Sequence, residues 1–443
     1  MNLLEKVKTA GVIGAGGAGF PTHVKLQSKA EYVLLNGAEC EPLLRVDQQL
    51  MEFYGEEIIS GLNMAADFTG ARKAIIGIKV KHKKVIKILK DTIEELGLND
   101  RIEVKTLPDI YPAGDEQVLV YELTGRVVPE TGIPIAVGCI VMNTETALNV
   151  YNAAEDQAVI MKYVTVAGDV PNPVTVKVPV GTPIKSVLEQ CGISDFTDYS
   201  VIDGGPMMGP LLKDMNSFVT KKTKGLVVLK STHSLIARKK KTMKSAVMLN
   251  KTACEQCRMC TDLCPRYLLG HSTSPHKMVR AAGYGLGTHE DKTVAFTCCQ
   301  CNLCEYFSCP AGINPKMANV YYMNLLREAG IKHKPVKEDF SPRHVREYRL
   351  IPSKRLVARL NLQYFDKPAP LKDGISIEPS IVGMSLRDHV GAPAVSVVNV
   401  GDRVNAGDKI AEIPEGALGA AVHASISGIV EAVEPDLITV RRG

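Results

Sequence analysis

The sequence contains no tryptophan, and aromatic residues make up only 5% of its 443 positions. It also lacks an apolar run near the roughly 18–20 residues needed to cross a bilayer, since the longest candidate, 132–142, is interrupted by Pro and Gly. The N-terminus has no apolar core followed by a small-residue cleavage site, as a signal peptide would. The net charge of +5 is too small and too spread to indicate a nucleic-acid or membrane partner. We therefore expect a soluble, cytoplasmic protein with no transmembrane segment and no nucleic-acid partner.

Cysteine is unevenly distributed, because nine of the 12 cysteines lie between Cys254 and Cys309. Disulfide frameworks are typical of small secreted domains, which this chain does not resemble. Clustered cysteines in an intracellular protein instead indicate metal binding or redox chemistry. The length, together with an apolar content of 45%, leaves room for several domains that each bury a core.

The N-terminal third alternates strand-like and helix-like stretches, which predicts an α/β domain over residues 1–157. Continuous apolar runs at 31–38 and 72–80 are typical of buried strands. Apolar residues recur at helical spacing over 56–70 and 83–97.

Residues 160–230 predict a smaller α+β domain of the β-grasp type. Apolar and polar residues alternate between Gly and Pro turns over 162–182, which predicts a β-hairpin, and a helix is expected over 183–192. The basic stretch 237–246 that follows is expected to be a solvated linker. A binding patch for an anionic partner is the alternative.

Three further regions complete a multidomain α/β and α+β organisation. The cysteine-rich block predicts a helical ferredoxin-type domain over 245–330, and 331–375 is expected to be a basic helical linker. The β-rich stretch 376–443 resembles the barrel-sandwich domains of biotinyl and lipoyl carriers. Its hairpin tip at 412–419 has no lysine to modify, so we expect a structural or docking module there.

Two cysteine runs have the spacing of bacterial ferredoxins. The first, CEQCRMCTDLCP, reads C-x2-C-x2-C-x3-C-P and contains Cys254, Cys257, Cys260 and Cys264. The second, CCQCNLCEYFSCP, has one more residue before its last cysteine and contains Cys298, Cys301, Cys304 and Cys309. Soft thiolates at this spacing suit iron–sulfur clusters, and the fourth cysteine of each run serves the other cluster.

This cross-ligation divides the eight cysteines into two sets, each predicted to hold one [4Fe-4S] cluster. The first set is Cys254, Cys257, Cys260 and Cys309. The second set is Cys264, Cys298, Cys301 and Cys304. Two structural zinc sites are the alternative, which is disfavoured because both runs are complete and end in Cys-Pro.

The other cysteines and nearby histidines receive no ligand role. Cys299 is spare, because using it in place of Cys298 would break the spacing to Cys301. Isolated free cysteines are commonly buried. The residues expected to serve packing or hydrogen bonding are Cys40, Cys139, Cys191, His271 and His276.

A glycine-rich stretch, GVIGAGGAGFP, contains G-x-G-x-x-G at Gly14, Gly16 and Gly19. A dinucleotide-binding turn needs a strand before the glycines and an acid about 20 residues later. Glu39 meets the second requirement. The preceding residues look helical, so the first requirement is poorly met, and the motif alone is weak.

Four ordered motifs reassign this loop: GAGGAGFPTHVK (14–25), NGAECEP (36–42), YPAGDEQVLVYELTGR (111–126) and VMNTETALNV (141–150). Their order resembles the flavin-and-NADH subunit of respiratory complex I, and the following hairpin module resembles the SLBB β-grasp domain of that family. The combination with a two-cluster block also resembles the C subunit of the Rnf complex. The further motifs VDQQLM, GGPMMG and YRLIPSKRL resemble those of the cobalamin reductases of propanediol-utilisation microcompartments.

The resemblance implies a flavin site made from the four motifs. Glu39 and Glu116 are implied as the catalytic carboxylates. The implied cofactor-binding residues are Gly14, Gly16, Gly17, Gly19, Lys25, Asn36, Glu41, Tyr111, Gly114, Asp115, Asn143 and Thr146. Ala15 and Ala38 depart from the family pattern, which has an arginine and an acid there.

The resemblance also implies an NADH-dependent oxidoreductase. NADH would deliver two electrons to FMN, and two [4Fe-4S] clusters would carry them singly to cobalamin or to a corrinoid-handling enzyme, with microcompartment shell proteins as further partners. The alternatives are an Rnf-like electron-transfer subunit with a different acceptor, and a non-catalytic scaffold with zinc sites.

Overall fold

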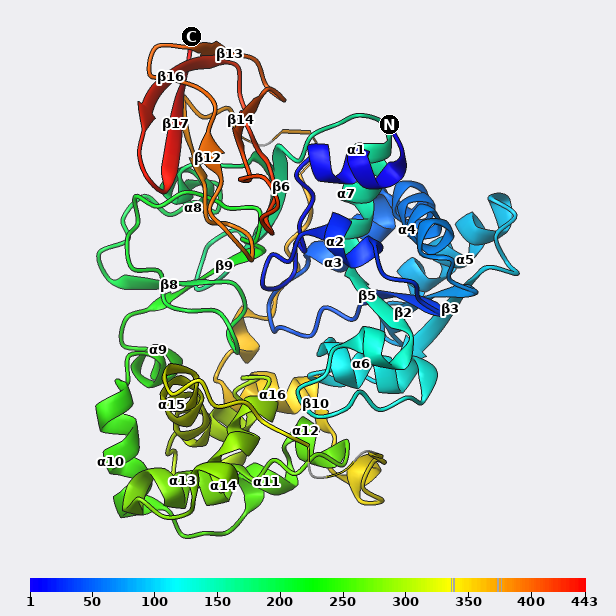
Figure 1. Ribbon diagram of the computed structural model, residues 1–443. Coiled ribbons are helices and arrows are strands. Elements are labelled where there is room, and N and C mark those ends of the chain that lie inside the picture. The colour runs from blue at the N-terminus through cyan, green and yellow to red at the C-terminus, as the bar shows by residue number, and fades with distance from the viewer. Residues whose placement is uncertain (336, 338, 373, 376) are drawn as a thin grey trace.

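The computed structural model describes residues 1–335, 337, 339–372, 374–375 and 377–443. Figure 1 shows an α/β domain on the right, a β-rich part on the left with the C-terminal strands above it, and a helical part below. Residues 336, 338, 373 and 376, which fall in the predicted linker or at the start of the predicted C-terminal domain, lie outside the described residues. Helices in the described part of the chain are too short or too polar to span a membrane.

The N-terminal domain is built on a parallel sheet with strand order β3-β2-β1-β5. Its strands are β1 (Tyr32–Gly37), β2 (Lys73–Lys79), β3 (Ile102–Leu107) and β5 (Cys139–Asn143). Its helices are α1 (Leu3–Thr9), α2 (Thr22–Leu26), α3 (Val46–Phe53), α4 (Gly55–Thr69), α5 (Lys83–Glu95), α6 (Glu116–Thr124) and α7 (Thr144–Ala154).

Both faces of this sheet are covered, which explains the continuous apolar runs of its strands. Val33 and Leu35 of β1 join the core under α4 and α7, while Leu34 points into the core under α6. The strand order reverses between β1 and β5, and α/β sheets bind ligands at the carboxyl ends of such strands. The predicted flavin motifs follow these ends.

The residues before the glycine loop are helical, as predicted. Asn2 caps α1 in a capping box with Glu5, and Val7 is buried in the core of the N-terminal domain. Only an isolated bridge, between Ile13 and Pro21, stands where a dinucleotide-binding fold would have a strand. The loop therefore departs from a Rossmann turn.

The second domain is a four-stranded sheet of order β7-β6-β9-β8. Its elements are β6 (Met161–Gly168), β7 (Val174–Pro179), α8 (Ile184–Glu189), β8 (Tyr199–Asp203) and β9 (Gly225–Lys230). The predicted hairpin is confirmed, since β6 and β7 pair in antiparallel register. The helix is shorter than the predicted 183–192.

The third part is helical, as the ferredoxin-like spacing predicts. Its helices are α9 (Ser234–Lys239), α10 (Met243–Ala253), α11 (Met259–Asp262), α12 (Pro265–Leu268), α13 (Pro275–Tyr284), α14 (His289–Thr293) and α15 (Pro315–Glu328). The predicted linker over 237–246 is largely helical, because α9 and α10 occupy most of it, and most of its residues are exposed or half-buried. Two of its lysines tie neighbouring loops together: Lys239 donates to the Gly209 carbonyl (2.6 Å) and Lys241 to the Gly312 carbonyl (3.1 Å).

The segment predicted as a helical linker contains a strand as well as a helix. Its β10 (Ile351–Pro352) pairs with β4 (Ile110–Tyr111) of the N-terminal domain, and α16 (Ser353–Arg359) follows. The sequence pattern missed β10 because a two-residue strand has no periodicity. This segment fastens the third part of the chain to the first.

The C-terminal domain is a sandwich of two small antiparallel sheets, with orders β11-β17-β16-β13 and β12-β14-β15. Its strands are β11 (Ile381–Ser385), β12 (Val395–Ser396), β13 (Arg403–Val404), β14 (Lys409–Glu412), β15 (Val422–His423), β16 (Gly428–Val433) and β17 (Leu437–Arg442). The chain just beyond its hairpin tip is docked, because Lys221 donates both to the Gly11 carbonyl (2.8 Å) and to the Ala421 carbonyl (3.0 Å).

The C-terminal domain also packs against the glycine loop. Val390 donates its N–H to the Gly19 carbonyl (3.1 Å), and a Cβ at Gly19 would lie 2.6 Å from the Asp388 carbonyl oxygen. Gly19 has a φ of +75°, whereas Gly17 has no such strain, and a Cβ placed there would meet no described heavy atom within 4 Å. The third glycine of the motif is thus required by domain packing.

We predict that Gly19→Ala destabilises the flavin-free protein by about 1–3 kcal/mol, because both its φ and its space are wrong for a side chain. Gly17→Ala is the matched control in the same loop and should leave the unfolding midpoint nearly unchanged. Thermal unfolding of the two variants compares them, and equal midpoints would contradict the packing role of Gly19.

Candidate flavin and iron–sulfur sites

The glycine loop is anchored to the start of α7. Ala15 donates its N–H to the Thr146 hydroxyl (3.0 Å), and Gly16 lies so close to Asn143 that a Cβ would come within 2.9 Å of its side-chain nitrogen. Gly17, in contrast, faces open space. A backbone without side chains at this point leaves room for a flat ligand to approach the loop, which fits FMN.

The opposite wall is formed where β1 and β4 end. Asn36 donates to the Gly114 carbonyl (2.9 Å), and Asp115 caps the N-terminus of α6. Lys25 donates to the Val141 carbonyl (2.9 Å) and lies 3.8 Å from the Glu116 carboxylate. The structure therefore brings residues of all four motifs together at the carboxyl ends of β1 and β5, and this predicted flavin site is called the crevice below.

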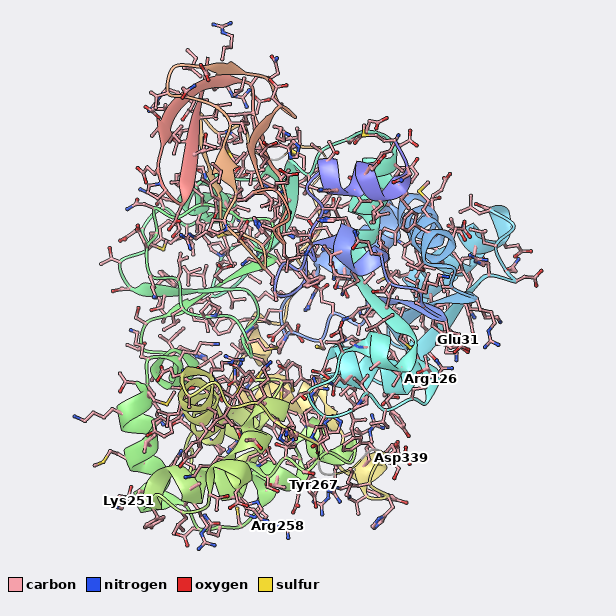
Figure 2. The ribbon with its side chains drawn as sticks, in the orientation of Figure 1. Glu31, Arg126, Lys251, Arg258, Tyr267 and Asp339 are labelled. Atoms are coloured by element: carbon pink, nitrogen blue, oxygen red, sulfur yellow. The ribbon has the colours of Figure 1, made fainter. Side chains whose placement is uncertain are left out.

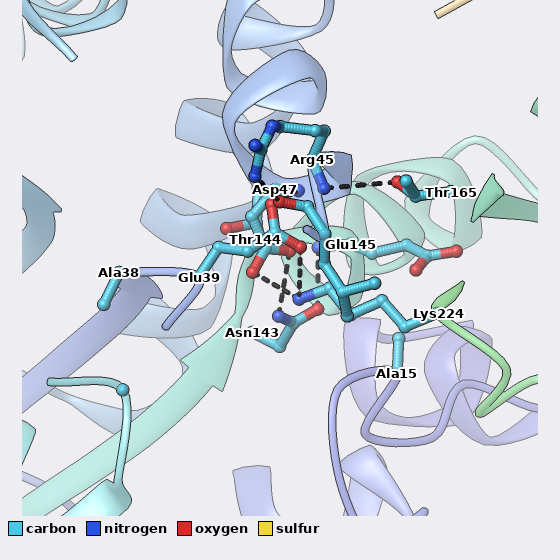
Figure 3. A network of polar contacts seen from close by, with 12 residues as sticks. Ala15, Ala38, Glu39, Arg45, Asp47, Asn143, Thr144, Glu145, Thr165 and Lys224 are labelled. Atoms are coloured by element: carbon cyan, nitrogen blue, oxygen red, sulfur yellow. Dashed lines mark hydrogen bonds and ion pairs between the residues drawn. The ribbon is translucent and has the colours of Figure 1, made fainter. Parts of the chain in front are cut away.

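A buried charge network lies behind this crevice (Figure 3). Asp47 donates its N–H to Glu39 (2.8 Å), and Asn143 donates to the Asp47 carboxylate (3.1 Å). Lys224, immediately before β9 in the second domain, forms ion pairs with both Asp47 and Glu39. One lysine thus neutralises part of the charge of two carboxylates from the N-terminal domain.

Glu39 is the strained member of this network. Its φ of +25° is uncommon for a residue other than glycine, and such strain concentrates at functional sites. Burial, opposed mainly by Lys224, raises the pKa of Glu39 to about 7. Its Oε1 finds no hydrogen-bond partner among the described residues, although Lys224 lies 3.5 Å away.

Four polar residues at this site were not predicted from the sequence: Asp47, Glu145, Lys162 and Lys224. Lys162 forms a buried ion pair with Glu145 (2.5 Å) and also donates to the Ala15 carbonyl (3.4 Å). Both lysines come from the second domain, so only the three-dimensional packing brings them here. Asp47 lies in the stretch VDQQLM, which contributed to the resemblance but received no role.

Glu41 points away from the glycine loop. Its carboxylate accepts hydrogen bonds from the backbone N–H groups of Met207 (2.8 Å) and Met208 (3.0 Å). A Cβ at Gly205 would lie 2.1 Å from this carboxylate, which accounts for one glycine of GGPMMG. Glu41 therefore joins the first two domains, and its contact with flavin stays a prediction.

Tyr111 and Asp115 face the helical part of the chain. The buried Tyr111 hydroxyl donates to the Cys301 carbonyl (2.8 Å), and the Asp115 carboxylate forms an ion pair with Arg266 (2.9 Å). Arg266 is only two residues beyond Cys264. The far wall of the crevice thus contacts the second cysteine run directly and the residue that follows the first run.

The two cysteine runs fold into matching loops. Backbone φ is positive at Gln256 and Arg258 in the first and at Gln300 and Asn302 in the second. Turns of this kind orient successive backbone N–H groups into one concavity that accepts anions, as at iron–sulfur sites. The match aligns Cys298 with Cys254. The thiol of Cys299 nevertheless lies close to those of Cys298, Cys301 and Cys264, so its exclusion from the ligands stays a prediction.

The neighbours of the thiols agree in part with the predicted partition, which stays a prediction. Burial and the nearby thiols of Cys309, Cys254 and Cys257 raise the pKa of Cys260 to about 12. Burial, the Glu305 carboxylate and the nearby thiols of Cys298, Cys260 and Cys264 raise the pKa of Cys304 far above its usual range. Within the described residues, no three Cys, His, Asp or Glu side chains converge tightly enough for a single metal ion. A four-iron cluster is larger than one ion, and the thiol-only donor set fits it.

The remaining cysteines and histidines are placed by packing. Cys139 and Cys191 are buried, whereas Cys40 packs beside Gly114 against the shared core of several domains. His271 bonds the Val128 carbonyl (2.9 Å) and His276 the Thr261 hydroxyl (2.7 Å).

Four family models match the chain in an order consistent with this architecture. They are a Nuo51 FMN-binding domain (residues 7–152), an SLBB domain (163–211), a 4Fe-4S dicluster domain (253–314) and an RnfC barrel sandwich hybrid domain (374–443). The fold class predicted from the sequence is confirmed, while the domain boundaries stay predictions.

Similar proteins cover nearly the whole chain. The cobalamin reductase PduS of Salmonella typhimurium is 44% identical over 99% of this chain and 96% of its own length. The protein of the same name from Citrobacter freundii is 43% identical over 99% of this chain and 96% of its own. The C subunit of the Na(+)-translocating ferredoxin:NAD(+) oxidoreductase complex of Acetobacterium woodii is 37% identical over 60% of this chain and 58% of its own.

A solved NAD+-reducing [NiFe]-hydrogenase, in its H2-reduced state, shares the fold. It has a TM-score of 0.50 and 22% identity over 76% of this chain and 63% of that one.

The FMN-binding domain and the 4Fe-4S dicluster domain define a flavin- and iron–sulfur-dependent oxidoreductase. The similarity to PduS over nearly the full length of the chain then identifies the family within this class. The chain belongs to the family of the cobalamin reductase PduS.

The raised pKa of Glu39 predicts a pH dependence of flavin reduction. Glu39 is neutral below about pH 7 and negative above it, and a negative carboxylate disfavours the negative charge that reduction adds nearby. We expect the rate of flavin bleaching by NADH to fall severalfold as pH rises through 7.

Glu39→Gln should stay at the low-pH rate throughout, whereas Glu52→Gln, on the same side of the domain but paired with Lys84, should retain the inflection. Stopped-flow absorbance from pH 6 to 8 measures this. An unchanged inflection in Glu39→Gln would assign it to another group.

Proposed function

We propose that this protein oxidises NADH and passes the electrons, through FMN and two [4Fe-4S] clusters, to cobalamin. The curated relatives of nearly full length are named cobalamin reductases, which supports the acceptor. The acceptor would be cob(III)alamin or cob(II)alamin, reduced to restore the cofactor of a diol dehydratase. The protein would reduce cobalamin either free in solution or bound to the enzyme that uses it.

The observation that carries the proposal is the contact between the crevice wall and the cysteine loops. Tyr111 and Asp115 contact Cys301 and Arg266 directly, so a flavin in the crevice and clusters on the loops would be neighbours. Electron transfer between cofactors requires such proximity, and the protein supplies it by position.

The roles of the crevice residues follow from where they lie. The N–H groups and the open backbone around Gly17 would hold the flavin phosphate and ring edge, with Asn143 and Thr146 fixing the loop. Lys25 would offset negative charge beside Glu116, and Asn36 with Gly114 would form the far wall. Glu39, held by Asp47 and Lys224, would set the charge next to the reacting ring. FMN, when bound, accepts hydride and releases electrons singly.

The two sets of four cysteines would each hold one cluster. The matching loops supply inward N–H groups as well as thiolates, and both features stabilise an anionic cluster. The predicted ligands are those named above, with Cys299 outside both sets.

A second candidate is an electron-transfer subunit of a larger complex. The similarity to the C subunit of the A. woodii complex and to the RnfC barrel sandwich hybrid domain favours it. Such a subunit would pass electrons to a protein partner and would not reduce cobalamin alone. Under the first proposal the protein works in the cytoplasm, in a microcompartment with shell proteins as neighbours.

Anaerobic purification followed by cofactor analysis tests the proposal. We expect one FMN and about eight irons with eight acid-labile sulfides per chain, the content of two four-iron clusters. NADH should bleach the flavin, and added cob(III)alamin should then be reduced. Flavin bleaching without cobalt reduction would favour the subunit alternative, and zinc in place of iron would exclude both.

Cys257→Ala separates the flavin chemistry from the clusters. The variant should lose about half of its iron, because one thiolate of the first set is missing, while NADH still bleaches the flavin at the wild-type rate. Iron analysis and stopped-flow absorbance measure the two properties. Loss of bound flavin would show that the two parts do not form independently.

A further inference from the structure

The two predicted cysteine sets differ in their relation to the flavin crevice. In the second set, the backbone carbonyl of Cys301 accepts a hydrogen bond from Tyr111. Arg266, two residues after Cys264 of the same set, forms an ion pair with Asp115. In the first set, Cys257 is exposed. Figure 1 shows α12, which begins after Cys264, on the side of α6, with α11 and α13 lying further below.

Arg266 is a buried charge at the junction. It is 8% exposed, and only one of its terminal nitrogens binds Asp115. The other, Nη1, finds no hydrogen-bond partner among the described residues. The guanidinium lies within electrostatic reach of the thiols of Cys299, Cys264 and Cys301. Asp115 therefore compensates the charge only in part, and the remainder acts on the second set.

The first loop has an arginine in a different environment. Arg258, between Cys257 and Cys260, has a side chain that is 53% exposed and lies 3.7 Å from the Asp262 carboxylate. Figure 2 shows Arg258 at the lower surface of the helical part, away from the N-terminal domain. Solvent screens an exposed charge of this kind, so it acts weakly on its neighbours.

We propose that the second set is the side on which electrons enter the iron–sulfur domain from the flavin, and that Arg266 is the positioning residue that raises the electron affinity there. The first set, with exposed Cys257, is then the exit side. This order deepens the proposed function, on which it rests. The argument is electrostatic: adding an electron adds negative charge, and a buried, half-compensated cation stabilises it far more than an exposed one.

The first experiment measures the midpoint potential of each cluster by dye-mediated titration, followed by electron paramagnetic resonance. Arg266→Gln should weaken the electron affinity of one cluster about tenfold, which is about 59 mV for a one-electron couple. Arg258→Gln, the matched control, should shift neither cluster appreciably. Arg266→Lys should recover part of the affinity, because it keeps the charge.

Unchanged potentials in Arg266→Gln would overturn the role of Arg266. This titration uses neither NADH nor cobalamin, so it is independent of the proposed donor and acceptor. If the Gln variant does not fold, the same comparison is made with Asp115→Asn, which frees Arg266 from its partner and should shift the same potential upward. A downward or absent shift would contradict the account.

The second experiment tests the order directly. Cys257→Ala and Cys301→Ala each remove one ligand, from the first and second set respectively, and iron analysis reports whether the other cluster remains. NADH should reduce the remaining cluster of Cys257→Ala far faster than that of Cys301→Ala. In Cys301→Ala the remaining cluster should be reduced by dithionite but more than about tenfold more slowly by NADH.

The reverse pattern would show that electrons enter at the first set. Flavin bleaching is recorded in the same experiment. If NADH bleaches the flavin in neither variant nor the wild type, the donor assignment fails, and photochemically reduced flavin then replaces NADH in testing the order.

Discussion

The hydrogen bond from the Tyr111 hydroxyl to the Cys301 carbonyl lies at the centre of this structure. It is buried in a core to which the N-terminal domain, the SLBB domain, the cysteine loops and the segment around β10 and α16 all contribute. A buried tyrosine needs a partner for its hydroxyl, and here that partner belongs to the neighbouring domain. This hydrogen bond and the core around it thus join the flavin crevice to the second cysteine loop.

The same logic explains how the other domains are joined. Lys224 and Lys162 of the SLBB domain form ion pairs with carboxylates behind the crevice. In the other direction, Glu41 of the N-terminal domain accepts a hydrogen bond from the backbone of Met207 in the SLBB domain. The C-terminal domain closes on Gly19 from the other side. Buried charges without partners would be costly, so these pairs hold the domains in one arrangement. The barrel-sandwich domain packs against the glycine loop and the second domain. This structural role agrees with the absence of a carrier lysine at its hairpin tip.

Much of this was predictable from the sequence, because the signals were local. Continuous apolar runs gave β1 and β2, alternation gave the β6–β7 hairpin, and cysteine spacing gave the two matching loops. The ordered motifs lie together because the carboxyl ends of parallel strands meet at the same edge of the sheet. Contacts between domains could not be predicted: Lys224 and Asp47 are separated by most of the N-terminal and SLBB domains. The two lysine–carbonyl contacts of the basic stretch 237–246 could not be predicted either, because charge alone does not show whether a lysine binds a carbonyl.

The central claim is that the crevice wall meets the second cysteine set. Its most direct test is a crystal structure of the anaerobically purified protein with FMN bound, with data collected at the iron absorption edge. Anomalous scattering should show two four-iron clusters. The account predicts that the cluster bound by Cys264, Cys298, Cys301 and Cys304 lies nearer the flavin ring. A flavin nearer the cluster of Cys257, or zinc at either loop, would contradict it.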